Sequence, residues 1–352
     1  MDINLFDYYL PEELIAQFPL KKRDQCKLLK VDVSAHSYRD LHFFDILEFI
    51  KPGDVLVRNN TKVIPARLIG IKTATKGRVE LILLKQLKGD NNWECLVGGA
   101  KAVKEGSECS FGEGKLIATC TKVFPEGIRH FHFSCNGIFL EVLEELGSMP
   151  LPPYIKKKCE DNNDYQTVYA KVPGSAAAPT AGFHFTEDLF NKIIEKGAEV
   201  VDVTLNIGLG TFRPVKVTDT KDHVMHSEEY EISKEAAEQL NKAKAEGRRI
   251  IAIGTTSVRT LESNISKFGV FKEEKSSTSI FISPGYEFKA IDALVTNFHL
   301  PKSTLIMLIS AMVGRQFTLE LYEHAVKEKY RFFSFGDAMF IEGKCDPKTS
   351  IN

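Results

Sequence analysis

Residues 67–98 read RLIGIKTATKGRVELILLKQLKGDNNWECLVG, and this stretch decides how the chain divides into domains. It contains three short runs of strand-forming residues, separated by turn residues at 75–77 and 89–92. Two more such runs, KLIATCTKVF and IRHFHFSC, follow the turns at 112–114 and 125–127. Short, evenly spaced strands with glycine-containing turns favour a small barrel or sandwich.

The end of this unit is marked by a helix and a group of prolines. A helix is expected over residues 138–146, because apolar residues recur there at helical spacing. Pro150, Pro152 and Pro153 then break regular structure.

The rest of the chain has a different rhythm, in which helices and strands alternate and so imply a mostly parallel or mixed sheet. Helices are expected to begin near Thr186, Ser233, Ser303 and Thr318, whose side chains can cap a first turn. The expected strands are 54–64 (DVLVRNNTKVI), 198–207 (AEVVDVTLNI), 250–254 (IIAIG), 279–282 (SIFI), 293–298 (ALVTNF) and 331–336 (RFFSFG). We therefore predict an α/β fold: a mixed-sheet α/β catalytic domain of residues 1–65 and 151–352, interrupted by an inserted small β-barrel domain of residues 66–150.

The composition is that of a globular protein, with 43% hydrophobic and 26% charged residues among 352. The longest apolar run, 305–313, is too short for a bilayer that needs about 20 residues, and the start MDINLFDYYL has no secretory pattern. Seven cysteines without a CxxC pair are a poor disulfide framework, so we expect a soluble cytoplasmic protein with no membrane partner. Because 46 Lys and Arg nearly balance 47 Asp and Glu, nucleic acid would have to bind to a local basic patch.

Residues 250–259, IIAIGTTSVR, combine a strand, a glycine, a hydroxyl-rich turn and the start of a helix. A helix N-terminus presents free N–H groups and a partial positive charge, so Thr255, Thr256 and Arg259 could bind a carboxylate or a phosphate. The alternative is a plain turn in which the hydroxyl groups only cap the helix. The segment GLGTFRP at 208–214 lacks the third glycine and the following helix of a dinucleotide-binding loop.

Histidines are the candidate acid–base groups near neutral pH. His223 and His226 lie beside Glu228 and Glu229, and this cluster could hold a metal, transfer protons or form a polar loop.

Three further polar residues stand next to expected elements. His184 precedes an expected helix, whereas His299 and Asp337 follow expected strands. In open α/β sheets, functional sites collect at the carboxyl ends of the strands, so His299 in particular is a site candidate.

Several longer strings, taken together, are similar to one family. They are LPEELIAQFPL (10–20), PGDVLVRNNTKVIPARL (52–68), MPLPPYI (149–155), YQTVYAKVPGSAAAPTAGFHFTE (165–187), IGLGTFRPVKV (207–217), HVMHSEEYE (223–231), IAIGTTSVRTLES (251–263), DALVTNFHLPKSTLIMLISA (292–311) and YRFFSFGDAMFI (330–341). They resemble the S-adenosylmethionine:tRNA ribosyltransferase-isomerase family of queuosine biosynthesis. The family's architecture is an α/β domain interrupted by a small β-barrel, which agrees with the pattern above.

The resemblance implies an enzyme that uses S-adenosylmethionine as a ribosyl donor. The acceptor is 7-aminomethyl-7-deazaguanine at the wobble position of a tRNA, and the products are epoxyqueuosine-tRNA, adenine and methionine. No cofactor beyond S-adenosylmethionine, used as a co-substrate, and no metal is expected, and we expect a monomer. A tRNA substrate also predicts a basic, aromatic-bearing surface, for which the barrel is a candidate platform.

The reaction needs a base, an acid that protonates the departing adenine, and groups that hold the two substrates. The candidate catalytic residues are His226 and His184 as general base or acid, with Asp337 and Glu228 to orient the imidazole or hold the acceptor amine. The candidate substrate-binding residues are Arg259, Thr255 and Thr256 for the methionine carboxylate, Phe183, Phe212 and Phe298 for the sulfonium or adenine, and Arg213 and His299.

The chain departs from the family's pattern at several positions, among them Asn206, where the family usually has histidine, and Arg58, where it usually has an apolar aromatic residue. The 98–103 stretch also lacks the Lys-Pro pattern common in the barrel, and Phe183 replaces a leucine. Asparagine cannot take a proton near neutral pH, so a scheme that uses a histidine there is in doubt. Three alternative functions stay open: a pure tRNA-binding module, a metal-dependent hydrolase built on His223 and His226, and an S-adenosylmethionine methyltransferase.

Overall fold

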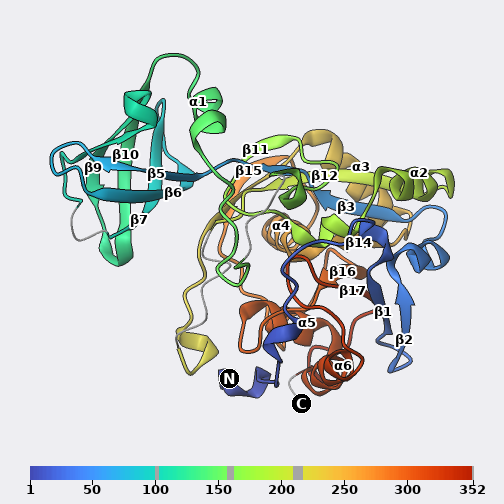
Figure 1. Cartoon of the computed structure of the whole chain (residues 1–352). Helices are drawn as coiled ribbons and strands as arrows, with labels where there is room; N and C mark the ends of the chain where they lie inside the picture. Colours follow the sequence, from blue (N-terminus) through green and yellow to red (C-terminus); the bar gives the residue numbers. More distant parts are fainter. Residues whose placement is uncertain (100–102, 157–161, 209–216, 351–352) are drawn as a thin grey trace.

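Six antiparallel strands close into a barrel at one end of the molecule, and a nine-stranded mixed sheet covered by helices forms the rest (Figure 1). The computed structural model describes residues 1–99, 103–156, 162–208 and 217–350. This architecture confirms the predicted α/β fold with an inserted β-barrel.

The barrel has the strand order β10-β7-β6-β5-β8-β9 and is filled by the alternate residues of its strands. In β6, for example, Val79, Leu81 and Leu83 point inward and are buried. The helix α1, Phe139–Leu146, follows the last strand, and Phe139 contacts the ring of Trp93. The strands are β5 (Arg67–Lys72), β6 (Arg78–Gln86), β7 (Asn92–Gly98), β8 (Glu108–Phe111), β9 (Leu116–Val123) and β10 (Ile128–Cys135).

The chain enters and leaves the barrel through two backbones in close contact. Arg67 and Ser148 exchange backbone hydrogen bonds of 3.0 and 2.9 Å. A Cβ atom on Gly147 would lie 2.0 Å from the carbonyl oxygen of Pro65, so only glycine fits there. All six barrel strands and α1 lie within residues 66–150. The boundaries at 65 and 150 stay a prediction.

The large sheet has the order β15-β13-β12-β3-β14-β16-β17-β1-β2. Its centre, β12, β3, β14 and β16, is parallel, so the carboxyl ends of these strands meet at one edge. The strands are β1 (Lys27–Asp32), β2 (Ser37–His42), β3 (Val55–Asn59), β12 (Glu199–Leu205), β13 (Glu228–Ile232), β14 (Ile250–Ile253), β15 (Glu274–Thr278), β16 (Ala293–Asn297) and β17 (Ala338–Glu342). A separate pair, β4 (Thr61–Val63) and β11 (Val172–Ser175), lies at the carboxyl end of β3.

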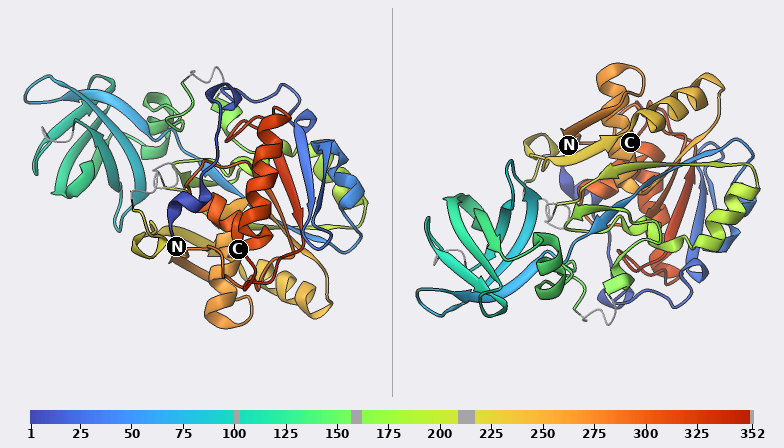
Figure 2. Two further views of the ribbon diagram at one scale, coloured as in Figure 1. Left: turned by 90° about the horizontal axis from the view of Figure 1, so that it is seen from below. Right: turned by 90° about the horizontal axis from the view of Figure 1, so that it is seen from above.

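Helices cover both faces of the sheet (Figure 2). One core contains apolar residues of α3, α4, α5 and α6, and the other contains those of α2 and the 3-10 helix η4. The α-helices are α2 (Glu187–Glu195), α3 (Lys234–Ala245), α4 (Gly254–Phe268), α5 (Thr304–Val313) and α6 (Arg315–Lys327). The 3-10 helices are η1 (Ile3–Phe6), η2 (Glu12–Leu14), η3 (Arg23–Gln25), η4 (Phe43–Phe49), η6 (Gly112–Gly114), η7 (Pro125–Gly127), η8 (Asn162–Tyr165), η9 (Thr180–His184) and η11 (Thr220–Asp222). Among the described residues, no helix taken alone has both the length and the apolar composition needed to cross a membrane. Helices α5 and α6 reach that length and composition only as a pair, and they are bent by 114° relative to each other.

Two predicted strands are wrong. The segment 279–282 is not a strand: Ile282 packs into the core, and the edge strand β15 forms just before it, over Glu274–Thr278. The segment 331–336 forms a turn, in which Phe333 adopts a φ of 69°. The last strand is β17, so Asp337 precedes a strand instead of following one. The helix expected at Thr318 begins earlier, at Arg315.

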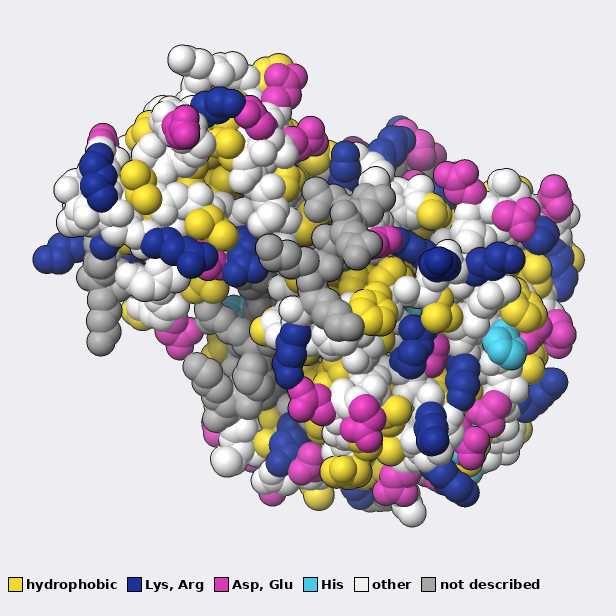
Figure 3. Space-filling model, viewed as in Figure 1, with side chains coloured by type: hydrophobic (Ala, Val, Ile, Leu, Met, Phe, Trp, Pro, Cys, Tyr) yellow, Lys and Arg dark blue, Asp and Glu magenta, His cyan; other side chains and the backbone are white. Residues whose placement is uncertain are grey.

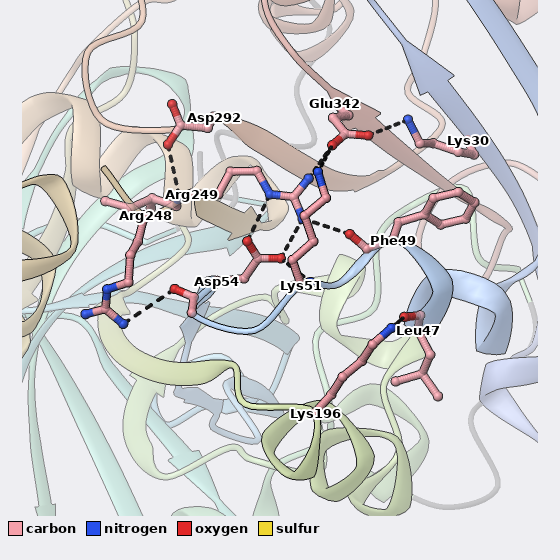
Figure 4. A network of polar contacts seen from close by, with 12 residues as sticks. Lys30, Leu47, Phe49, Lys51, Asp54, Lys196, Arg248, Arg249, Asp292 and Glu342 are labelled. Atoms are coloured by element: carbon pink, nitrogen blue, oxygen red, sulfur yellow. Dashed lines mark hydrogen bonds and ion pairs between the residues drawn. The ribbon is translucent and has the colours of Figure 1, made fainter. Parts of the chain in front are cut away.

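A network of ion pairs ties the strands together at the edge opposite the carboxyl ends of β3 and β14 (Figure 4). Arg249, just before β14, donates to Asp54 and to the Phe49 carbonyl, and it also pairs with Glu342 at the end of β17. Lys30 of β1 binds the same glutamate at 2.8 Å. The network joins β3, β14, β17 and β1 and leaves the other edge free for a functional site.

Candidate functional site

A cavity lies at the carboxyl ends of β14 and β16, the edge at which α/β proteins place their sites. It contains about 740 Å³ of space, its open mouth included. Its lining is mostly apolar, with hydroxyl, amide and imidazole groups among the apolar residues. The lining residues are Tyr154, Ala178, Pro179, Thr180, Ala181, Ile207, Gly254, Thr255, Thr256, Thr296, Asn297, Phe298, His299, Leu300, Ser303, Leu305, Phe333 and Ser334.

Two helices begin at this cavity. Helix α4 follows β14 directly and has no side-chain cap at Ile253, whereas the N-cap of α5, Ser303, accepts a hydrogen bond from Ile306 N. Thr255 and Thr256 lie in the first turn of α4, and the buried hydroxyl of Thr256 has no hydrogen-bond partner among the described residues. An uncapped first turn offers free N–H donors and a partial positive charge to an anion.

The cavity also contains His299, a buried imidazole. Its Nε2 lies 2.9 Å from the hydroxyl of Thr296, and its backbone N–H donates to the hydroxyl of Tyr322. Burial lowers the pKa of His299 to about 3, so the ring is neutral near pH 7. In that state it can donate and accept hydrogen bonds but carries no charge.

Aromatic rings form another wall of the cavity. The ring of Tyr154 lies 4.9 Å from that of Phe333, and the Tyr154 hydroxyl makes a 2.7 Å hydrogen bond with Ser334. The ring of Phe298, a predicted binding residue, packs away from this wall against Tyr322 and other core aromatics. Tyr154 and Phe333 are therefore better placed than Phe298 to face a ligand.

A smaller pocket lies behind Ser334, which lines both spaces. His184 and Phe183 line this second pocket and not the main cavity. Burial, followed by the charge of Arg331, lowers the pKa of His184 to about 3. Phe183 stacks on Phe335. His184 and Phe183 thus line a different pocket from Thr255, Thr256 and His299, and Ser334 lines both.

Arg259 and Glu228 are brought together, although the sequence suggested different tasks for them. Both are buried, and the Arg259 guanidinium forms an ion pair with the Glu228 carboxylate. Glu228 also accepts a 3.2 Å hydrogen bond from Gly208 N. Arg259 lies in the second turn of α4 and is not among the residues that line the main cavity.

A groove of about 1550 Å³, its mouth included, lies between the barrel and the edge of the large sheet. Glu228 lines it, and Lys85 of the barrel reaches across to pair with Glu229 at 3.1 Å. The lining residues are Leu84, Lys85, Gln86, Leu87, Lys88, Trp93, Val172, Pro173, Gly174, Thr204, Asn206, Gly208, Ser227, Glu228, Glu229, Tyr230, Glu231, Lys275, Ser276 and Ser277. Figure 3 shows Lys and Arg side chains along the side of the barrel that adjoins the larger domain.

His226 is exposed in the segment just before this groove, next in the chain to Ser227. The pKa of its neighbour His223 is lowered by partial burial and by the charge of His226, so the two imidazoles lie close enough to interact. Within the described residues, no three His, Cys, Asp or Glu side chains gather closely enough to hold a metal ion.

The carboxylate of Asp337 is surrounded by hydrogen-bond donors. Its carboxylate accepts hydrogen bonds from the backbone N–H groups of Lys27 and Arg331, at 3.0 and 2.7 Å, and from the Arg331 guanidinium. It is buried and lines neither pocket. These contacts hold the turn before β17.

The departures at Arg58 and Asn206 are accommodated by contacts with neighbouring side chains. The guanidinium of Arg58 lies over the rings of Tyr169 and Phe190 and pairs with Asp202 at 2.6 Å, so it takes the place of an aromatic side chain in a stack. Asn206 accepts a 2.8 Å hydrogen bond from Thr61 and lines the groove.

Sequence reasoning did not single out Tyr154, Asn297, Phe333 or Ser334, although all four lie within the strings that carry the resemblance. Asn297 ends a strand two residues before His299, which is the one local signal that points to it. Phe212 and Arg213 lie outside the residues that the structure describes.

Comparison with known proteins supports the family suggested by the motifs. A family model described as queuosine biosynthesis protein matches residues 3–341. The chain is also similar to the crystal structure of S-adenosylmethionine tRNA ribosyltransferase from Thermotoga maritima, with 36% sequence identity over 96% of this chain and 99% of that chain, and a TM-score of 0.55. Since the family model spans nearly its whole length, the chain belongs to the queuosine biosynthesis protein family.

Proposed function

We propose that this chain transfers and isomerises the ribosyl moiety of S-adenosylmethionine onto 7-aminomethyl-7-deazaguanine at the wobble position of a tRNA. The products are epoxyqueuosine-tRNA, adenine and methionine. The observation that carries the proposal is the cavity at the ends of β14 and β16, in which an uncapped helix N-terminus and the aromatic rings of Tyr154 and Phe333 line a space of about 740 Å³.

S-adenosylmethionine fits the chemistry of this lining. Its methionine carboxylate would accept hydrogen bonds from the first turn of α4 and from Thr255 and Thr256, whose hydroxyl groups lie there. The sulfonium and adenine would face the rings of Tyr154 and Phe333, because aromatic faces attract cations and stack on bases. His299 would donate or accept a hydrogen bond as a neutral ring.

The acceptor nucleotide would enter by the groove between barrel and sheet. Lys85 and Lys88 line it and can lie near phosphate groups. His226 would transfer protons on this side, and Glu228, held by its partner Arg259, would accept a hydrogen bond from the amine end of the acceptor. The proposed enzyme is a monomer of the cytoplasm and needs no cofactor beyond S-adenosylmethionine.

The test is a chromatographic and mass-spectrometric assay with S-adenosylmethionine and a tRNA that carries 7-aminomethyl-7-deazaguanine. The proposal expects free adenine, free methionine and epoxyqueuosine in the digested tRNA. S-adenosylhomocysteine as the product would instead identify a methyltransferase, and tRNA binding without any product would identify a binding module. Activity that is lost with a chelator and restored by zinc or manganese would identify a metal-dependent enzyme.

A further inference from the structure

The string LPEELIAQFPL at residues 10–20 is one of those that carry the family resemblance, and the proposed reaction uses none of it. Its residues, all of them described, are absent from the lining of the cavity. Residues 14–17 of this string, the 14–17 segment, instead make hydrogen bonds to the backbone of two residues, Tyr154 in the cavity wall and Phe332 beside it. The string is therefore placed to support the wall from outside.

The side-chain amide of Gln17 binds the backbone on both sides of Ile155. Its Nε2 donates to the Tyr154 carbonyl at 3.0 Å, and its Oε1 accepts from Lys156 N at 2.9 Å. The carbonyl can only accept and the backbone N–H can only donate, so these two bonds fix which way round the amide lies. They resemble the contacts that a neighbouring parallel strand would make. An ionised glutamate has no donor and a lysine has no acceptor, so neither could make both bonds.

The rest of the 14–17 segment holds the chain next to Phe333. Phe332 N donates to the Leu14 carbonyl at 2.8 Å, and Ala16 N donates to the Phe332 carbonyl at 3.2 Å. These two bonds pair the segment with Phe332 as in a parallel sheet. Ala16 is itself buried in an apolar cluster, which anchors the segment.

The two residues supported in this way form the aromatic wall of the cavity. The rings of Tyr154 and Phe333 lie 4.9 Å apart, and the Tyr154 hydroxyl makes a 2.7 Å hydrogen bond with Ser334. Tyr154 lies outside any helix or strand, so its backbone depends on contacts with other segments. Phe333 has a φ of 69°, a conformation that a bulky side chain keeps only where its surroundings hold it.

We propose that Gln17 is a positioning residue, which sets the place of the Tyr154 ring in the cavity through its two hydrogen bonds to the backbone of residues 154–156. The inference rests on the proposed function, because the position of the ring is read through binding of S-adenosylmethionine. Gln17 does not line the cavity, so its effect on the ligand passes through Tyr154.

The kinetic test uses Gln17→Glu, which has the same length and keeps an oxygen for Lys156 N but loses the donor to Tyr154. We expect Q17E to raise KM for S-adenosylmethionine about 5- to 20-fold with kcat within about twofold, because a ligand contact is displaced and the reacting groups are not. A protein that is merely destabilised would instead lose kcat with its folded fraction and keep its KM. Glu12→Gln is the matched control, because Glu12 also contacts Lys156, through an exposed ion pair, and should leave KM unchanged.

A double-variant cycle tests whether Gln17 acts through the Tyr154 ring. Tyr154→Ala removes the ring but keeps the backbone carbonyl to which Gln17 donates. If the ring carries the effect, Q17E should change KM much less in the Y154A background than in the wild type. An equal change in the two backgrounds, a wild-type KM in Q17E, or a loss confined to kcat would overturn the inference.

Amide hydrogen exchange followed by NMR needs no substrate. The N–H of Lys156 should exchange faster in Gln17→Ala, which loses both bonds, and should stay protected in Q17E, whose oxygen can still accept. Exchange at the wild-type rate in Q17A would show that Gln17 does not hold this backbone. If the wild-type protein releases no adenine, the proposed function fails, but the exchange result is unaffected, so the two failures are distinguishable.

Discussion

Arg259 of α4 and Glu228 of β13 form an ion pair whose two side chains are only 8% and 4% exposed. The pair joins the helix that begins at the cavity to the edge strand that lines the groove. Nε and Nη2 of Arg259 have no hydrogen-bond partner among the described residues, so its charge depends on the glutamate.

Removing one member of this pair should therefore destabilise the protein strongly. We expect Glu228→Ala to lower the free energy of unfolding by about 3–5 kcal/mol, because it leaves a buried charge without compensation. The double variant Glu228→Leu, Arg259→Met should lose less than Glu228→Ala alone. Urea denaturation followed by circular dichroism measures both. A loss in the double variant equal to the sum of the losses in Glu228→Ala and Arg259→Met would show that the pair is not coupled.

Thr256 lines the cavity, and its buried hydroxyl group makes no hydrogen bond to the described residues. If it binds the methionine carboxylate, Thr256→Val should weaken binding of S-adenosylmethionine about 5- to 10-fold, as expected for one lost hydrogen bond, and Thr256→Ser should restore it. Isothermal titration without tRNA measures this. Thr121→Val, on an exposed barrel position, should bind like the wild type. Unchanged affinity of Thr256→Val would place the carboxylate elsewhere.

Two buried histidines should make stability depend on pH. Burial lowers the pKa values of His184 and His299 to about 3, below the value of about 6.5 in an unfolded chain. Below pH 6.5 the unfolded chain takes up protons that the folded protein excludes, so stability falls as the pH falls toward 3. Between pH 7.5 and 5 each residue should cost about 2 kcal/mol.

The measurement is the urea midpoint at a series of pH values. His184→Gln and His299→Gln should each remove part of the slope. A wild-type slope in either glutamine variant would mean that the replaced imidazole is protonated equally in the folded and unfolded states.

Asp54 should matter for stability but not for substrate binding. Its carboxylate is buried and binds Arg249 at 3.0 Å through Nε and at 2.5 Å through Nη2, at the edge opposite the cavity. We expect Asp54→Ala to lose about 3 kcal/mol or more, with an unchanged KM for S-adenosylmethionine. Lys51→Ala is the control, because Lys51 is exposed and should contribute under about 1 kcal/mol. A raised KM in Asp54→Ala would show that the two edges are coupled.

Local patterns were sufficient to predict much of the fold. The caps expected at Thr186, Ser233 and Ser303 form, and each side chain accepts a hydrogen bond from the N–H three residues later. The alternation in residues 67–98 builds barrel strands, because every second side chain can fill the interior. These interactions involve residues close together in the chain, so the sequence alone was sufficient to predict them.

Prediction from local patterns failed where contacts with distant segments of the chain determine the backbone conformation. Phe333 sits in a run that alternates like a strand, but Asn297 and Gly336 bind its carbonyl and a turn forms instead. The apolar residues 280–282 similarly pack into a core formed by other elements, so the edge strand forms just before them.

The amino-acid sequence by itself determined the division into barrel and sheet, most helix starts and the family, because these depend on local periodicity, caps and long matching strings. Only the tertiary structure decided that Thr256, His299, Tyr154 and Phe333 share one cavity, while His184 lies behind it and Arg259 pairs with Glu228. The physical reason is that burial and hydrogen-bond partners are set by segments far apart in the chain, which meet where the strands end.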